Sequence, residues 1–362
     1  MVQTPQPVEL NKDNVVVLDY NLLVNPTTDY TSAIEQAFGS GPSCLGVLLV
    51  KNVPGLAPRR ESLLQLASTL GNLPKSTLAK AHDEVTEWVG WDHGTEVFNG
   101  RPDLAKGSFY ANPLHDVPCE DQAKLAKFPG MTRPNKWLPQ DLPDLEPKFK
   151  DLAQLIVRVG TLVGQQCDKY ATSRDIAEYP GEHYLEQVVA TSRTHKGRLL
   201  HYYPLNTLPE EYRAPGNVDN LCGWHLDNSS ITGLTSAMYV REQLDPATGQ
   251  LLALEQVAAP PADAGLFIRT RGGDMVKVGI PKDCLAFQIG EALQLSTQGK
   301  LRATWHCVFG GSATDLARNT LAVFMQPDWT HPSVATAHLP SFPCGCMRRT
   351  MRVRPGRGRG WQ

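Results

Sequence analysis

Residues 222–232 read Cys-Gly-Trp-His-Leu-Asp-Asn-Ser-Ser-Ile-Thr, and a β-prone segment continues from there to Val240. His225 and Asp227 are two positions apart, so in an extended backbone their side chains point to the same side. An imidazole and a carboxylate on one face of a strand can hold a metal ion. The His-X-Asp pair alone is weak support for a metal site, because a chain of this length with 10 His contains such a spacing by chance fairly often.

A third candidate ligand follows downstream in a similar setting. Residues 302–309 read Arg-Ala-Thr-Trp-His-Cys-Val-Phe, which is also a β-prone segment. His306 from this segment would join His225 and Asp227 in the 2-His-1-carboxylate set that binds Fe(II) on one face. This set leaves the other coordination positions open, which indicates a catalytic metal.

A cation and a hydroxyl occur two positions apart in the next β-type run, 318–327, which reads Arg-Asn-Thr-Leu-Ala-Val-Phe-Met-Gln-Pro. Arg318 and Thr320 would share one face of that strand. A planar guanidinium makes two parallel charge-assisted hydrogen bonds to a carboxylate, and a hydroxyl beside it adds a further donor. The run therefore predicts a clamp for a carboxylate.

These three features together resemble the 2-oxoglutarate- and Fe(II)-dependent oxygenases, specifically the isopenicillin N synthase-like branch. Further segments are similar to strands of that family: 198–204 (Arg-Leu-Leu-His-Tyr-Tyr-Pro), 273–278, 287–296, and the opening strands 15–20 and 46–52. The resemblance covers roughly residues 14 to 330. Two positions depart from the family pattern, because His201 stands where Asn is usual and Cys307 where Arg commonly follows the distal His.

The resemblance implies a role for each motif. His225, Asp227 and His306 would hold Fe(II), which 2-oxoglutarate chelates through its keto acid end and which also binds O2. Arg318 and Thr320 would hold the distal carboxylate of 2-oxoglutarate, with Tyr203 as a further donor. The expected reaction oxidises a C–H bond of a small organic substrate and releases succinate and CO2. No catalytic residue beyond the metal ligands is expected.

Aromatic side chains provide candidates for the substrate pocket. The stretch 87–113 mixes aromatic residues with Gly and short polar residues, as a loop over a pocket mouth does. The candidates for the pocket wall are Trp91, Phe109 and Tyr110 from this stretch, with Trp224 and Tyr239 near the ligand motifs. The alternative is that these rings pack in the core, since aromatic side chains bury readily.

Hydrophobic periodicity predicts the fold class. Residues 148–171 carry apolar side chains at i, i+3, i+4 and i+7, which indicates an amphipathic helix. After Lys196 the period changes to 2, and we expect strands at 198–204, 231–240, 266–270, 275–279, 285–289, 292–297, 302–309 and 319–326. This pattern predicts a mixed α/β protein with a double-stranded β-helix core, which is a jelly-roll or cupin-like arrangement, backed by helices.

We expect three regions along the chain. Residues 1–172 would brace the core as a helix and strand region similar to the N-terminal part of non-haem dioxygenases. Residues 173–330 would form the jelly-roll oxygenase domain, with an inserted loop near 241–265 because Pro and Gly cluster there. Residues 331–362 would be a C-terminal extension that ends in an Arg/Gly-rich tail.

Composition and charge limit the possible partners and location. The formal net charge of −2 predicts no global attraction to nucleic acid, although the Arg/Gly tail leaves weak RNA binding open beside a solubilising role. No apolar run approaches ~18 residues, and the first 14 residues are polar. We therefore expect a cytoplasmic protein without a membrane partner, and the sequence does not determine its oligomeric state.

Three alternatives stay open at this stage. The first is an Fe(II)/O2 oxidase of the same fold that does not use 2-oxoglutarate. The second is a non-enzymatic binding protein on a jelly-roll frame, and the third is a protein that binds or modifies nucleic acid through its tail. The primary substrate is also open, since hydroxylation, desaturation, ring closure and demethylation can share one metal site.

Overall fold

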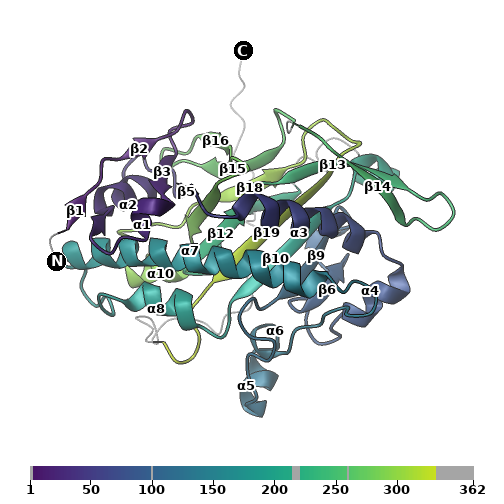
Figure 1. Cartoon of the computed structure of the whole chain (residues 1–362), viewed down its shortest axis with the longest axis horizontal. Coiled ribbons are helices and arrows are strands. Elements are labelled where there is room, and N and C mark those ends of the chain that lie inside the picture. The colour runs from purple at the N-terminus through teal and green to yellow at the C-terminus, as the bar shows by residue number, and fades with distance from the viewer. Residues whose placement is uncertain (1–2, 99–100, 214–220, 259–260, 332–362) are drawn as a thin grey trace, which may run out of the picture.

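Two β-sheets dominate the protein, and helices cover the outer face of the larger sheet (Figure 1). The structure is a computed structural model, and it describes residues 3–98, 101–213, 221–258 and 261–331. This architecture confirms the predicted mixed α/β class.

The larger sheet has eleven strands in the described residues. Its order is β2 (Glu9–Leu10), β3 (Val16–Asp19), β5 (Val47–Lys51), β17 (Leu285–Ile289), β12 (Ile231–Thr235), β19 (Ala317–Met325), β10 (Lys196–Tyr202), β9 (Lys106–Ala111) and β6 (Gly90–His93). The hairpin of β13 (Met238–Leu244) and β14 (Leu251–Gln256) also pairs with β19. Strands from residues 9–111 therefore extend the sheet at both edges, which places the N-terminal region within the same core.

The smaller sheet has four strands and faces the larger one. Its order is β11 (Cys222–His225), β18 (His306–Phe309), β15 (Gly265–Arg269) and β16 (Met275–Val278). Leu266 and Ile268 of β15 pack against Val17, Leu49 and Ala286 of the larger sheet in one buried cluster. Alternation along each strand sends every second side chain into the space between the sheets. His225, His306 and Arg318 lie on strands that border this space, and Asp227 directly follows one of them.

Two long helices cover the opposite face of the larger sheet. These are α3 (Leu56–Gly71) and α7 (Leu145–Ser173), which cross in front of the sheet in Figure 1. The apolar stripe of α7 is buried, and Gly160 lets the helix approach Met325 and Phe287, because a Cβ at this glycine would lie 2.7 Å from the Met325 sulfur. The predicted helix at 148–171 is confirmed, although it begins earlier and ends later.

Shorter elements complete the described chain. The helices are α1 (Tyr20–Leu23), α2 (Thr31–Phe38), α4 (Lys75–Ala81), α5 (Gln122–Lys127), α6 (Pro129–Thr132), α8 (Tyr184–Thr191), the 3-10 turn η1 (Leu205–Thr207), α9 (Glu210–Arg213) and α10 (Glu291–Ser296). Two small ribbons pair β1 (Thr4–Pro5) with β4 (Thr28–Asp29) and β7 (Val97–Phe98) with β8 (Arg101–Pro102). Within the described part of the chain, every helix is too short or too polar to cross a bilayer.

Two predictions from the sequence are wrong. The segment 292–297 is not a strand but lies largely in α10, where Leu293 is fully buried and Leu295 is 45% exposed. A strand would have placed these two side chains on the same face, so the alternating pattern was misleading. The expected loop at 241–265 is largely the β13–β14 hairpin, whose turn contains Gly249 with a positive φ of 71°. The Arg/Gly-rich tail lies outside the described residues.

Candidate metal centre

The three predicted ligands meet where the smaller sheet adjoins the larger one. His225 ends β11 and His306 begins β18, and the antiparallel register of these two strands pairs the two residues directly. Their ring centroids are 4.2 Å apart. Asp227 follows β11 and carries its carboxylate to the same point. The ligand atoms of all three residues lie within 4.8 Å of one another.

Backbone carbonyls fix the orientation of both imidazoles. Nδ1 of His225 is 2.7 Å from the Gly223 carbonyl, and Nδ1 of His306 is 3.0 Å from the Thr304 carbonyl. A carbonyl only accepts hydrogen bonds, so each Nδ1 carries a proton, and in the neutral ring each Nε2 keeps its lone pair. The two Nε2 atoms lie 3.7 and 3.6 Å from the same oxygen, Oδ1 of Asp227. Two lone pairs and one carboxylate oxygen thus converge.

Burial keeps one of these imidazoles neutral. The pKa of His306 is lowered to about 4, because burial disfavours the imidazolium and the neighbouring His225 acts in the same direction, against the opposing charge of Asp227. A metal ion binds imidazole only in its neutral form. His306 is therefore ready to bind a metal at neutral pH without releasing a proton.

A hydroxyl chain holds the second oxygen of Asp227. The Thr232 hydroxyl donates to Oδ2 at 2.6 Å, and Ser229 Oγ lies 2.8 Å from the Thr232 hydroxyl. Since the Thr232 proton goes to Asp227, Ser229 is the donor in the second bond. All three side chains are buried. Asp227 therefore presents Oδ1 to the imidazoles while Oδ2 is occupied, an arrangement that favours binding through one oxygen.

The loop that carries Asp227 is anchored on α10. The Glu291 amide donates to the Asp227 carbonyl at 2.7 Å, and the Gly290 amide donates to the Ser230 carbonyl at 3.1 Å. A Cβ at Gly290 would lie 2.0 Å from the Ser229 carbonyl oxygen. Only glycine permits this approach of the two backbones, so the sequence at 290 helps to set the position of Asp227.

A second group of polar atoms surrounds Arg318 on β19. Its register partners are Tyr202 on β10 and Tyr239 on β13. The guanidinium carbon lies 5.0 Å from the centroid of the Tyr202 ring. Among the described residues, Nε and Nη1 of Arg318 and the Tyr239 hydroxyl are buried without a hydrogen-bond partner. Leaving such donors unpaired costs roughly 1–3 kcal/mol each, so this cluster needs an acceptor.

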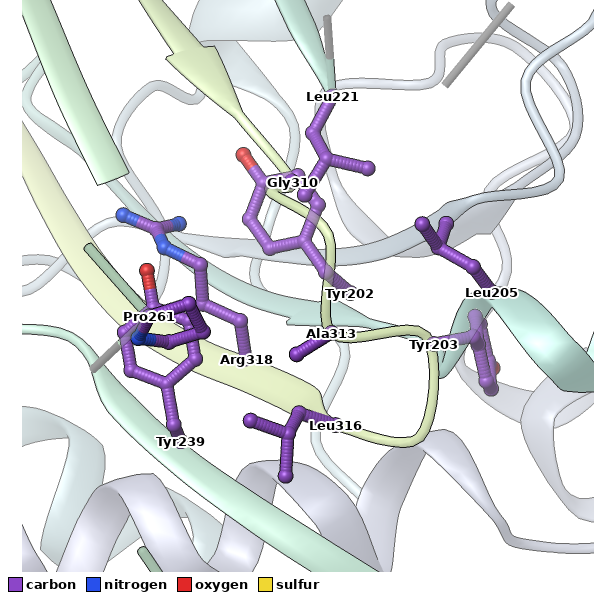
Figure 2. Close-up of a pocket in the computed structure, with 10 residues that line it drawn as sticks. All are labelled: Tyr202, Tyr203, Leu205, Leu221, Tyr239, Pro261, Gly310, Ala313, Leu316 and Arg318. Carbon is purple, nitrogen blue, oxygen red and sulfur yellow. The ribbon is translucent and has the colours of Figure 1, made fainter. Parts of the chain in front are cut away.

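These three side chains line one pocket (Figure 2). The pocket encloses about 310 Å³ of space, part of which is open to solvent, and apolar residues such as Leu205, Leu221 and Leu316 form much of the remaining wall. We call Tyr202, Arg318 and Tyr239 the clamp.

Thr320 and Tyr203 occupy different positions relative to the clamp. Thr320 lies two residues beyond Arg318 on β19, is 8% exposed, and its hydroxyl lies 3.5 Å from that of Thr235. Tyr203 lines the edge of the pocket, but its hydroxyl donates to the Gly71 carbonyl at 2.7 Å on the α3 side of the sheet. The structure thus places the ring of Tyr202 over Arg318, while the hydroxyl of Tyr203, which was predicted as a further donor to the co-substrate, is bonded to Gly71.

The predicted pocket aromatics are distributed over four environments, one of which is the buried ion cluster around Tyr110. Trp91 and Phe109 belong to the main hydrophobic core behind the larger sheet, where Phe109 packs against Phe149 of α7. Trp224 lies under the guanidinium of Arg269, an exposed residue, with 5.0 Å between the guanidinium carbon and the ring centroid. Trp91 and Phe109 therefore occupy packing positions in the core. Tyr239 lies at the clamp.

Tyr110 lies in a buried ion cluster on the neighbouring strands. Its hydroxyl donates to Glu96 at 3.3 Å, and its ring lies 5.0 Å from the guanidinium carbon of Arg198. Arg198 and Lys106 each approach Glu96 to 2.7 Å, and Lys106 also pairs with Asp103. The opposite charges compensate each other, as buried ions require. Nothing in the sequence spacing indicated this cluster.

Comparisons with known proteins find the fold of this chain among solved structures. No protein-family model matches the sequence, and no curated protein matches it. Among solved structures, a Caulobacter crescentus protein assigned to the 2OG-Fe(II) oxygenase family superposes with a TM-score of 0.62 at 18% identity, over 87% of this chain and 88% of that chain. The chain has the fold of the 2OG-Fe(II) oxygenases. This likeness supports the resemblance on which the site prediction was based.

Two further oxygenase-fold structures carry ligands in their descriptions. A full-length Neurospora crassa protein in complex with alpha-ketoglutarate and thymine has a TM-score of 0.59 at 17% identity, over 89% of each chain. The Arabidopsis thaliana dioxygenase for auxin oxidation 1, in a binary complex with 2-oxoglutarate, has a TM-score of 0.53 at 15% identity, over 87% of this chain and 94% of that chain. At these identities the likeness concerns the fold.

Sequence reasoning missed Tyr202, Thr232 and Glu242. Tyr202 could have been found from strand pairing, since an inward-facing Arg318 requires an inward-facing partner on β10. Thr232 lies five residues after Asp227, within reach across the turn that precedes β12. Glu242 has no local signal, because its buried partners lie more than 40 residues away.

Proposed function

We propose that the protein is an Fe(II)- and 2-oxoglutarate-dependent oxygenase that oxidises a small organic substrate and releases succinate and CO2. The convergence of His225, Asp227 and His306 within 4.8 Å carries the proposal. Two ligand atoms on one ion are at most about 4.2 Å apart, twice a metal–nitrogen bond of about 2.1 Å. The observed separations therefore need only small side-chain movements to close around one ion.

The donor set fits Fe(II) and excludes a closed structural site. Two neutral imidazoles and one carboxylate on one side of an ion leave its other coordination positions free. The ordered tautomers of His225 and His306 and the single available oxygen of Asp227 all precede metal binding. These residues would hold the iron without rearranging their hydrogen bonds.

The clamp fits the distal carboxylate of 2-oxoglutarate. Arg318 and Tyr239 together offer three buried donor atoms that have no partner among the described residues. A carboxylate accepts such bonds in parallel, and the guanidinium fork matches its geometry. Thr320 extends the donors along the same strand, as the resemblance implies, while Tyr202 covers the guanidinium with its ring.

Fe(II), 2-oxoglutarate and O2 would supply the oxidising chemistry, and the chain would supply position and exclusion of water. Burial of His306 and Asp227 keeps solvent from the ligands. Arg318 would fix one end of the co-substrate so that its other end reaches the ligand triad. We also infer that the two facing sheets form the double-stranded β-helix that this fold uses to bring distant strands together.

The first experiment measures coupled turnover. Purified full-length protein is loaded with Fe(II) without oxygen, then given 2-oxoglutarate, O2 and pools of small metabolites, and succinate is quantified. We expect succinate formation that requires 2-oxoglutarate and is stimulated by some pools. Oxygen consumption that proceeds without 2-oxoglutarate would instead identify the oxidase alternative.

The second experiment separates the clamp from the metal site. We expect Arg318→Ala to weaken 2-oxoglutarate binding at least about thirtyfold, because truncating one partner of a buried charge pair costs roughly 2 kcal/mol or more. Co(II) affinity, measured by calorimetry in place of Fe(II), should change less than about twofold. Arg269→Ala removes an exposed arginine and serves as the matched control. Equal 2-oxoglutarate affinity in all three proteins would refute the assignment of Arg318.

A further inference from the structure

A closed polar network lies on the α3 side of the larger sheet, directly behind the clamp. His201 on β10 and Glu242 on β13 are its central members, and their side chains are 1% and 2% exposed. Nε2 of His201 lies 3.7 Å from Oε1 of Glu242, and neither atom has a hydrogen-bond partner among the described residues. Two buried orphan atoms therefore face each other.

The neighbours of His201 determine which of its ring nitrogens carries a proton. The Asn319 amide group donates to the Leu64 carbonyl at 2.8 Å and to Ser68 Oγ at 2.7 Å, so its oxygen is the atom that faces the ring. This oxygen lies 2.8 Å from Nδ1 of His201 and can only accept. Nδ1 is therefore protonated, and in a neutral ring Nε2 presents a lone pair to Glu242.

That arrangement is unfavourable unless one more proton is present. A carboxylate oxygen and an imidazole lone pair repel each other. Within the described part of the chain, the other oxygen of Glu242 accepts a hydrogen bond only from the Asn72 amide, at 3.2 Å. Burying an ionised carboxylate with so little compensation costs several kcal/mol. One proton between Oε1 and Nε2 satisfies both atoms and leaves the pair without net charge.

The titratable groups around the pair do not replace this proton. Burial lowers the pKa of His201, and His93 of β6 adds to this effect, against the opposing effects of Glu242 and Asn319. Tyr203 stacks edge-on at 4.5 Å, and its pKa is raised by burial and by Glu242. The side chains from α3 that reach the network, Ser68 and Asn72, carry no charge.

The network links the strands that carry the clamp. His201 precedes Tyr202 on β10, Asn319 follows Arg318 on β19, and Glu242 lies on β13 with Tyr239. Adjacent residues on a strand point to opposite faces of the sheet. The network on the α3 face therefore holds in position the three strands whose opposite face carries the clamp side chains. Gly71 adds to this tight packing, because a Cβ there would lie 2.3 Å from the His201 ring.

We propose that His201 and Glu242 hold one shared proton at neutral pH, and that this pair positions the clamp for the carboxylate it binds. The shared proton is argued from the buried contact alone, whereas the positioning role rests on the proposed function. The protonated pair stabilises the fold, so this contribution is present at neutral pH and is lost as rising pH removes the proton.

The test uses Glu242→Gln, which mimics the protonated acid without being able to lose the proton. A glutamine amide can donate to Nε2 while its oxygen accepts from Asn72. Unfolding by urea is followed from about pH 6 to about pH 10 in the absence of ligands, a range that spans the ordinary titration of His and extends to Lys. Glu255→Gln, on the exposed side of the same hairpin, is the matched control.

We expect wild type and Glu242→Gln to have similar stability near pH 7 and to diverge as the pH rises, with wild type losing stability first. The Glu255→Gln variant should follow wild type. Parallel curves for wild type and Glu242→Gln over the whole range would overturn the shared proton. This comparison needs neither metal nor co-substrate, so it stands even if the proposed function fails.

The positioning role is tested by 2-oxoglutarate binding to the Co(II)-loaded protein over the same pH range. Arg318 and both carboxylates of 2-oxoglutarate keep their charges there, so they cannot produce a decline in affinity. We expect wild type to lose affinity at alkaline pH and Glu242→Gln to keep it. Glu242→Leu, which cannot hydrogen-bond, should bind about tenfold more weakly at every pH. Identical affinity profiles of all three proteins would refute the positioning role.

Discussion

The hydrogen bond from Thr232 to Asp227 gives a sharp prediction about the metal site. Thr232→Val removes one hydroxyl and keeps the branched shape of a buried strand residue. The lost bond joins a hydroxyl to a carboxylate over 2.6 Å, and bonds to charged groups contribute about 1.5–3 kcal/mol. Losing an outer partner of a metal ligand typically costs 10–100-fold in affinity, which is the same magnitude.

The substitution has a second expected effect on the co-substrate. Once Oδ2 of Asp227 has lost its donor, both carboxylate oxygens are free to bind the ion. A carboxylate bound through two oxygens occupies a position that 2-oxoglutarate or O2 would otherwise use. We therefore expect 2-oxoglutarate affinity to fall even when Co(II) is saturating. The expected order is a loss of metal affinity of about tenfold or more, followed by a smaller loss for 2-oxoglutarate.

Calorimetric titration of the apoprotein with Co(II), and then with 2-oxoglutarate, measures both effects. Thr232→Ser restores the hydroxyl and should recover most of the metal affinity, which separates the hydrogen bond from general packing. Thermal unfolding of the apoproteins checks that the Val variant is folded. If Thr232→Val binds Co(II) within about twofold of wild type, the Thr232 hydroxyl does not orient Asp227 and the argument for a preorganised site is refuted.

Two further predictions concern the scaffold. Gly290→Ala should lower the free energy of unfolding by about 1–3 kcal/mol and weaken Co(II) binding, because the new Cβ would lie 2.0 Å from the Ser229 carbonyl oxygen. Gly272→Ala is the control, because a Cβ at that position has no neighbouring atom closer than 3.7 Å. Burial lowers the pKa of His195 to about 4, so its unfolded form takes up a proton below about pH 6.5 while the folded form does not. Stability measured by urea unfolding should therefore fall by up to about 3 kcal/mol between these values, and equal stability at pH 7 and pH 4.5 would contradict this.

The ligand triad could be predicted because each part of it is local in sequence. His225 and Asp227 lie two residues apart, and His306 stands in a short β-prone run, so residue type and spacing suffice to nominate them. What sequence could not give is the register of β11 against β18, which makes two residues 81 positions apart into direct neighbours. That register follows from the packing of the two sheets as a whole. The prediction that the three ligands meet therefore depended on the resemblance to a known fold.

The clamp shows why sequence alone does not decide which of two neighbouring residues faces a site. Tyr202 and Tyr203 are identical in type, and the family pattern points to the second of them. In the structure the pairing of β10 with β19 places Tyr202 opposite Arg318, and Tyr203 turns to the helix side. A shift of one residue exchanges the two faces of a strand, so only the register decides between them. By the same alternation Tyr110 points to the face of the sheet that carries Arg198, and Phe109 points to the opposite face, into the core beneath α7.

His201, which departs from the family pattern, acquires a physical reason once Glu242 is considered with it. A histidine brings a second ring nitrogen to a place where an asparagine would have none, and a buried nitrogen requires a partner. Glu242 provides that partner at 3.7 Å, from a hairpin where the sequence predicted only a loop. Each residue alone is an anomaly, because one is an unusual imidazole and the other a buried acid. Together with one proton they satisfy each other, so a substitution at position 242 should be tolerated when it leaves a donor for the ring nitrogen, as Glu242→Gln does, and not when it leaves none, as in Glu242→Leu.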